Sequence, residues 1–232
     1  MRPSETQGYR ERLDEVRAVI ASACARAGRS PDDVTLVAVA KTFPADRVAA
    51  AIEAGATDIG ENRAQELKEK AAVLGDRVRW HFIGPLQTNK VRQVVGVATL
   101  IHSVDRFGLG EAIARRARSL GIVQDVLVEV NVAGEATKSG VEPTGVAGLV
   151  TKLDTLEGLR VVGLMTIPPH ADETESARSH FARLVELRDE VAVGMPDIRH
   201  LSMGMSGDFA IAVEEGATLV RVGTAIFGPR SR

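Results

Sequence analysis

Apolar runs alternate with amphipathic segments from the start of the chain. Positions 5–26 carry apolar residues at helical spacing between charged ones, which predicts an amphipathic helix. Positions 34–41 form a β-branched, almost wholly apolar run, so they predict a strand that is buried on both faces and ends at Lys41. The segment 45–54 predicts a second helix, closed by Gly55. The chain therefore opens as helix, strand, helix.

The same alternation continues to the end of the chain. The expected strands are 34–41, 58–62, 78–84, 99–104, 125–131, 159–166, 198–203 and 218–223. The helices expected between them are 45–54, 64–74, 88–95, 106–120, 143–153, 174–193 and 208–215. This pattern predicts an α/β protein with a (β/α)8 TIM barrel and an extra N-terminal helix. No linker or repeat divides the sequence, so we expect a single domain over residues 1–232.

An open, doubly wound sheet is the alternative architecture. It would bind a dinucleotide through a glycine-rich turn that follows a strand. The only similar stretch, Gly108-Leu109-Gly110, lacks a third glycine at the required spacing and does not follow a predicted strand end. The barrel is therefore favoured.

Composition excludes several classes of function. The chain has 232 residues, of which 44% are hydrophobic and 26% charged, and a net charge of -2, so it shows no electrostatic signature of nucleic-acid or membrane binding. No apolar run approaches the roughly 20 residues of a membrane span, and the N-terminus lacks the apolar core of a signal peptide. We expect a cytoplasmic protein. No large apolar surface stretch is left over, which favours a monomer.

A barrel carries its chemistry at the carboxyl ends of its strands. Lys41 would emerge there, and a partly desolvated amine is a plausible Schiff-base nucleophile. Polar residues also end other predicted strands, namely Asn62, His81, Ser103, Asn131, Thr166, Ser202 and Arg221.

Two stretches near the C-terminus predict a phosphate site. Small residues at 202–208 lie between a strand and a helix, so Ser206 could cap that helix while nearby backbone N–H groups bind an anion. In the second stretch, a strand leads directly into Gly223 and Thr224. Barrels commonly build phosphate sites from the loops after strands seven and eight.

An imine-forming lysine beside a phosphate site is what pyridoxal 5′-phosphate (PLP) requires. Arg221 would point into the barrel two residues before Gly223. A guanidinium facing the pyridine nitrogen would keep that nitrogen unprotonated, because arginine does not release its proton. The alternative role for Arg221 is a salt bridge inside the barrel.

Six motifs, spread over nearly the whole chain, are considered together: Ala40–Thr42, Gly60–Glu66, His81–Lys90, Gly163–Thr166, Leu201–Asp208 and Arg221–Gly228. Together they resemble the pyridoxal phosphate homeostasis protein family (YggS/PROSC-like). The resemblance implies a fold type III barrel, like the N-terminal domain of alanine racemase, with PLP bound covalently to Lys41. It also implies roles for the other site residues: Ser206, Gly223 and Thr224 would hold the phosphate, Arg221 would face the pyridine nitrogen, Asn62 would lie near the ring, and Met203 near the phosphate loop.

The same resemblance implies a protein that binds PLP, buffers its free concentration and hands it to PLP-dependent apoenzymes, with little or no catalysis. The enzymatic alternative is a PLP-dependent amino-acid racemase or related lyase, which needs a second proton-transfer group. In alanine racemases that group is a tyrosine from another subunit, associated with a C-terminal domain. Here the chain ends at Arg232, and its only tyrosine, Tyr9, lies in the N-terminal helix. We therefore expect no catalytic residue.

Two further possibilities concern the histidines and the lysine. The five histidines show no metal-ligand spacing, so no metal site is expected, and His81 belongs to a family motif without an assigned contact. A Schiff-base aldolase acting on a phosphorylated sugar would also use a barrel lysine and a phosphate site. Such an aldolase would be colourless, whereas PLP bound to lysine is yellow.

Overall fold

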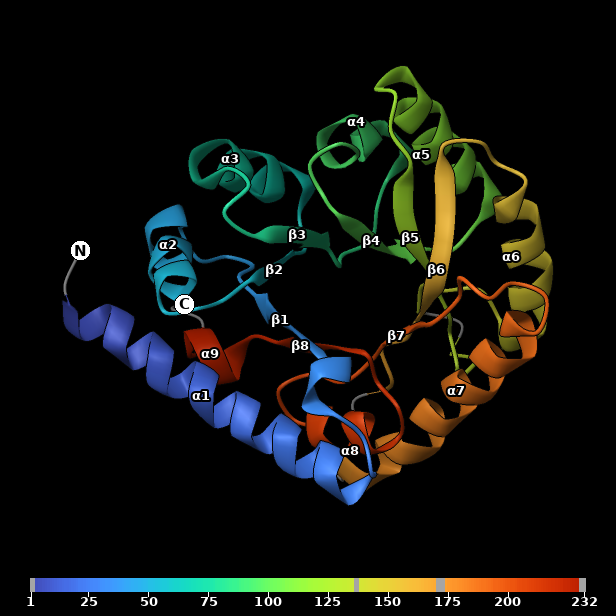
Figure 1. The fold of residues 1–232 in the computed structure, drawn as a ribbon. Helices are drawn as coiled ribbons and strands as arrows, with labels where there is room; N and C mark the ends of the chain where they lie inside the picture. The colour runs from blue at the N-terminus through green and yellow to red at the C-terminus, as the bar shows by residue number, and fades with distance from the viewer. Residues whose placement is uncertain (1–2, 136–137, 170–173, 230–232) are drawn as a thin grey trace.

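The computed structural model describes residues 3–135, 138–169 and 174–229, and it shows a closed parallel barrel (Figure 1). The strands follow one another around the barrel in chain order, and β8 pairs with β1 to close it. They are β1 (Thr35–Val39), β2 (Asp58–Glu61), β3 (Arg79–Phe82), β4 (Leu100–Val104), β5 (Gln124–Glu129), β6 (Leu159–Met165), β7 (His200–Ser202) and β8 (Leu219–Val222). The predicted (β/α)8 barrel is confirmed.

Helices surround the strands as an outer layer (Figure 1). The α-helices are α1 (Pro3–Arg26), α2 (Ala45–Glu53), α3 (Ala64–Leu74), α4 (Val91–Val94), α5 (Phe107–Ser119), α6 (Val146–Asp154), α7 (Arg178–Ala192), α8 (Phe209–Glu214) and α9 (Thr224–Phe227). Short 3-10 helices are η1 (Pro31–Asp33), η2 (Thr88–Lys90), η3 (Pro143–Gly145) and η4 (Thr174–Ala177). No helix in these described ranges is long and apolar enough to cross a membrane.

Period-two alternation divides the strand residues between two layers. The larger apolar cluster fills the space between barrel and helices, and it includes buried residues from every strand. A smaller, separate cluster fills part of the barrel interior with Val37, Leu100, Leu127, Val162, Met165 and Leu219. The remaining interior positions are largely polar and include buried His81, His102, Ser202 and Arg221. The interior is therefore partly polar, in contrast to the apolar outer layer.

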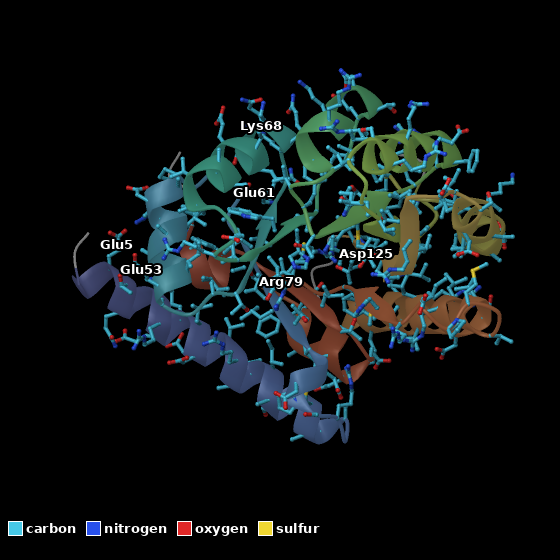
Figure 2. All side chains as sticks on the ribbon, turned by 45° about the horizontal axis from the view of Figure 1, so that its top comes forward. Glu5, Glu53, Glu61, Lys68, Arg79 and Asp125 are labelled. Atoms are coloured by element: carbon cyan, nitrogen blue, oxygen red, sulfur yellow. The ribbon has the colours of Figure 1, made fainter. Side chains whose placement is uncertain are left out.

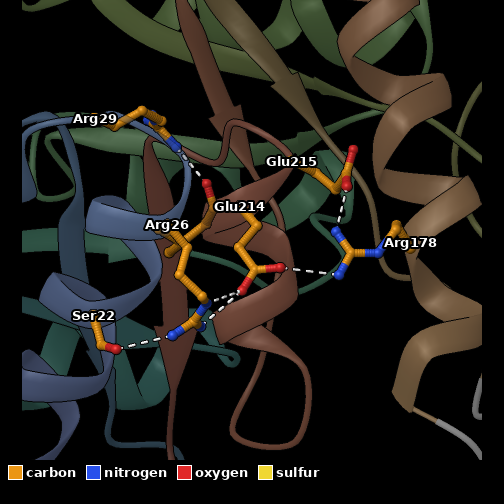
Figure 3. A network of polar contacts seen from close by, with 7 residues as sticks. Ser22, Arg26, Arg29, Arg178, Glu214 and Glu215 are labelled. Atoms are coloured by element: carbon orange, nitrogen blue, oxygen red, sulfur yellow. Dashed lines mark hydrogen bonds and ion pairs between the residues drawn. The ribbon is translucent and has the colours of Figure 1, made fainter.

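The extra N-terminal helix α1 lies outside the ring, along α9 and α8 (Figure 1). An ion-pair network fixes it there, because Glu214 of α8 accepts hydrogen bonds from Arg26 of α1 at 2.7 Å and Arg178 of α7 at 2.9 Å (Figure 3). Arg29 adds hydrogen bonds to the carbonyls of Val213 and Ala217. These contacts tie the first helix to the last third of the chain.

Strand β7 is shorter than expected. It spans three residues instead of the six predicted: all three pair with β6, whereas only Ser202 pairs with β8. On its other side, β7 approaches β6 closely: a Cβ added to Gly163 would lie 2.0 Å from the carbonyl oxygen of His200. Glycine is therefore required at position 163 for β7 to join the barrel.

Candidate cofactor site

Lys41 lies at the carboxyl end of β1, in a turn with an unusual backbone. The next residue, Thr42, has a φ of 73°, and among the described residues it is the one non-glycine residue with positive φ. Two hydrogen bonds hold this conformation: Thr42 N–H donates to Glu66 Oε2 at 2.9 Å, and Phe43 N–H donates to the Ala40 carbonyl at 3.1 Å. Strain of this kind persists only where the surroundings impose it, and it is frequent at functional sites.

A buried ion pair between Lys70 and Glu61 supports the same turn. Lys70 Nζ donates to the Ala40 carbonyl at 2.9 Å and to Glu61 Oε1 at 2.6 Å, and it also lies 3.4 Å from Glu66 Oε2. Burial raises the pKa of Glu61 to about 7, against the opposing effect of Lys70. Lys70 thus holds the backbone before Lys41 through the Ala40 carbonyl. The carboxylates of Glu61 and Glu66 hold Lys70 in turn.

The phosphate loops predicted after β7 and β8 lie side by side. Gly204 has a φ of 90°, and a Cβ there would lie 2.5 Å from that of Ala212, so the segment requires glycine. Ser206 Oγ accepts hydrogen bonds from Gly223 N–H at 3.2 Å and Ala225 N–H at 3.5 Å. A hydroxyl and two backbone N–H groups therefore converge at one point.

The predicted capping role of Ser206 is wrong. The residue that precedes α8 is Asp208, and neither side chain caps that helix. Asp208 instead accepts a hydrogen bond from Met205 N–H, which tightens the turn, and this leaves Ser206 directed at the start of α9. Ser206 thus joins the two loops together.

Strand pairing brings the end of β1 to these loops. Strands β1 and β8 pair with Ala38 opposite Val222, and a Cβ at Gly223 would meet Val39 at 3.4 to 3.5 Å. Lys41 follows Val39 by two residues and is half-buried. The end of β1, two residues before Lys41, therefore lies beside Gly223.

Arg221 is buried inside the barrel and is held from two sides. Its guanidinium donates to Ser202 Oγ at 2.6 Å and to the Thr166 carbonyl at 2.9 Å, which leaves N–H donors over. In the part of the chain that the structure describes, no carboxylate lies within ion-pair distance of it, so the salt bridge considered as an alternative is not formed there. Burial lowers the pKa of Arg221 to about 10. A buried cation with unused donors suits a ligand that carries an acceptor or negative charge.

The remaining predicted residues occupy three different environments. Asn62 packs against Gly84 so closely that a Cβ there would lie 2.2 Å from its carbonyl oxygen. Thr224 is exposed at the start of α9. Met203 is fully buried in the outer apolar cluster, whereas the neighbouring Ser202 faces the interior. The roles of Asn62, Thr224 and Met203 in cofactor binding stay predictions.

Several polar residues to which the sequence analysis assigned no contact lie inside the barrel. Asp58, His81, His102 and Ser202 are linked by hydrogen bonds, and Glu129 is buried with its pKa raised to about 7 by burial and by Asp105. The available signal was a polar residue at an inward position of an otherwise apolar strand. Among the described residues, no group of three or more His, Cys, Asp or Glu could hold a metal ion.

The alanine racemase N-terminal domain family matches residues 12–231 of this chain. The pyridoxal phosphate homeostasis protein of Aquifex aeolicus (strain VF5) is 48% identical over 225 residues, which is 95% of this chain and 97% of the relative. The chain belongs to the pyridoxal phosphate homeostasis protein family. This confirms the resemblance drawn from the six motifs.

Solved structures agree with this family assignment. A protein described as unknown from Bifidobacterium adolescentis has a TM-score of 0.92 and 39% identity, covering 97% of both chains. PipY of Synechococcus elongatus PCC7942, solved with PLP bound, has a TM-score of 0.83 and 35% identity, covering 95% of this chain and 100% of PipY. Both of these solved chains therefore share this barrel over essentially its whole length.

Proposed function

We propose that this protein binds PLP at the barrel mouth through a reversible covalent bond to Lys41, and that it buffers and delivers the cofactor. One observation carries the proposal: pairing of β1 with β8 places the end of the Lys41 strand beside the Ser206–Gly223 junction. PipY, a relative in the same family, has been solved with PLP bound, which supports this ligand.

The residues at the mouth fit the chemical groups of PLP. Ser206 and the N–H groups of Gly223 and Ala225 would bind the phosphate, with the Thr224 hydroxyl beside them. The unused donors of Arg221 would face the pyridine nitrogen. PLP would supply an aldehyde that condenses with an amine to a Schiff base, with loss of water, and so masks a reactive carbonyl reversibly.

Asn62 and Met203 complete the proposed binding set. Asn62 would lie near the ring, where the close approach of Gly84 fixes its backbone. Met203 follows β7 and precedes the Gly204 turn, so it would lie near the phosphate loop.

A homeostatic role is favoured over catalysis by the surroundings of the single tyrosine. Tyr9 is 1% exposed and packs against Phe227 outside the barrel, with ring centroids 5.5 Å apart. Burial raises the pKa of its hydroxyl, which makes it a poor proton-transfer group near neutral pH. We propose a monomeric, cytoplasmic carrier that supplies PLP-dependent apoenzymes and has no catalytic residue.

The test uses visible absorption and borohydride reduction. Wild-type protein mixed with PLP and then freed of unbound PLP should be yellow, and borohydride should convert the imine into a stable adduct located at Lys41 by mass spectrometry. Lys41→Ala should form no adduct, whereas Lys68→Ala, which changes an exposed lysine of α3 (Figure 2), should behave like the wild type. A wild-type protein that stays colourless with PLP would contradict the proposal and favour the aldolase alternative.

Assays for racemisation and decarboxylation of amino acids separate the carrier from the enzyme. Turnover at rates typical of enzymes, above about 1 per second, would contradict the homeostatic role while leaving the PLP site intact.

A further inference from the structure

A continuous chain of buried hydrogen bonds crosses the barrel interior. His81 Nε2 lies 2.9 Å from Asp58 Oδ1, His81 Nδ1 lies 3.0 Å from His102 Nε2, and His102 Nδ1 lies 2.8 Å from Ser202 Oγ. Ser202 Oγ in turn accepts the hydrogen bond from Arg221 at 2.6 Å. The five residues come from β2, β3, β4, β7 and β8, and each is no more than 4% exposed.

The chain runs from the base of the barrel toward its mouth. Asp58 and Arg79 are the first residues of β2 and β3, and Arg79 donates to both carboxylate oxygens at 2.7 and 2.6 Å. Thr57 adds a third donor to Asp58 at 2.8 Å. At the other end, Arg221 lies one residue before the end of β8 and two before Gly223. The network therefore links the amino-terminal ends of the strands to the proposed cofactor site.

Only one arrangement of protons satisfies every link with both histidines neutral. Asp58 can only accept, because hydrogen bonds outweigh the effect of burial and lower its pKa to about 2, so His81 carries its proton on Nε2. His81 Nδ1 then accepts from His102 Nε2, and His102 Nδ1 accepts from the Ser202 hydroxyl. Arg221 can only donate, so it fixes the opposite end.

Each side chain in this hydrogen-bond chain is hydrogen-bonded, as buried polar groups generally are. None of these side-chain atoms is among the buried unpartnered ones in the described residues. Burial keeps the pKa of His102 well below its ordinary value, in agreement with a neutral ring. Reversal of any single link would leave two donors or two acceptors facing each other.

We infer that Asp58, His81, His102 and Ser202 are positioning residues that orient Arg221 toward the pyridine nitrogen of PLP. This inference rests on the proposed PLP site. Ser202 is the residue that transmits the effect, because its hydroxyl donates to His102 Nδ1 and its oxygen accepts from Arg221, so it contacts both side chains. The guanidinium is thereby held in one plane, with the Thr166 carbonyl as its second anchor.

The first experiment determines the histidine tautomers by nitrogen NMR of histidine-labelled protein. His81 and His102 should each carry one proton, on Nε2, both with and without PLP. A proton on His102 Nδ1, or a doubly protonated ring at neutral pH, would overturn the one-directional chain. This result does not depend on where PLP binds.

The second experiment measures PLP affinity and the visible absorption band of bound PLP. Ser202→Ala and His102→Leu should weaken PLP binding about tenfold and shift the band, because a charged hydrogen bond loses its geometry. His102→Gln keeps one donor and one acceptor, so it should recover part of the affinity. His200→Gln changes an exposed histidine of β7 that is not part of the hydrogen-bond chain, so this variant should match the wild type.

The outcomes separate the two proposals. Failure of borohydride to trap PLP on Lys41 would overturn both the proposed function and the positioning role of the hydrogen-bond chain. Normal trapping, with wild-type affinity and an unshifted band in folded Ser202→Ala and His102→Leu, would overturn the positioning role alone. In a variant shown to be folded, overpacking or lost stability would leave the absorption band of bound PLP where it is. A shifted band therefore indicates that the residues position Arg221 and do not only stabilise the fold.

Discussion

Replacing Lys70 with methionine tests whether the buried ion pair holds the Lys41 turn. Methionine keeps most of the apolar stem but removes the donor to Ala40 and to Glu61 Oε1. Glu61 is fully buried, and its Oε2 already lacks a partner. Without Lys70 its carboxyl must stay protonated in the folded state, because an unpaired buried charge is costly.

The expected loss of stability depends on pH. The pKa of Glu61 is about 7 in the folded protein and 4.5 as a reference, so stability falls as pH rises between these values. In Lys70→Met the folded pKa rises further, so the fall continues above pH 7. We expect a loss of about 2 kcal/mol at pH 6 from the missing donor, and about 1.4 kcal/mol more at pH 8, which corresponds to one pKa unit.

Urea unfolding of PLP-free protein at pH 6 and pH 8 measures both values. Lys68→Met lies on the same helix with its side chain at the outer surface (Figure 2), so it should change stability by less than about 0.5 kcal/mol at either pH. The double variant Glu61→Gln with Lys70→Met should lose the pH dependence. An equal loss for Lys70→Met at both pH values would refute the role assigned to Glu61.

Three further substitutions test other parts of the structure. Gly84→Ala should lower the free energy of unfolding by about 1–3 kcal/mol and weaken PLP binding, because its Cβ would lie 2.2 Å from the Asn62 carbonyl oxygen. Urea unfolding and PLP titration measure both effects, and unchanged values would contradict the packing argument. Glu129→Gln should gain stability relative to the wild type as pH rises from 5 to 8, because the wild-type carboxyl, with a folded pKa of about 7, ionises at a cost that an amide avoids; a difference between the two proteins that is independent of pH would contradict this reasoning. Glu214→Gln should lower the melting temperature by a few degrees, because it weakens the ion pairs that join α1 to α7. The difference in melting temperature from the wild type should shrink as pH falls through the lowered pKa of Glu214, and a difference that persists in acid would count against the ion pairs.

The apolar pattern of the sequence determined the barrel and the elements that end at its mouth. Strands buried on both faces need cover on both sides, and eight of them separated by helices leave few topologies. The positions of Lys41, Arg221 and Gly223 followed from the same pattern, because a residue that ends a strand must emerge at one rim. The six motifs added the family and the expected ligand.

Only the tertiary structure decided which polar side chains meet inside the barrel. Asp58 and His81 are 23 positions apart, and His102 and Ser202 are 100 apart, so no local spacing signals their contact. Ser206 was assigned to the helix that follows it, but closure of the barrel brings Gly223 N–H to its hydroxyl from 17 positions away. The pattern of the chain defines which face of a strand points inward. The register of eight paired strands then defines which inward residues share a layer, and that register exists only once the barrel has closed.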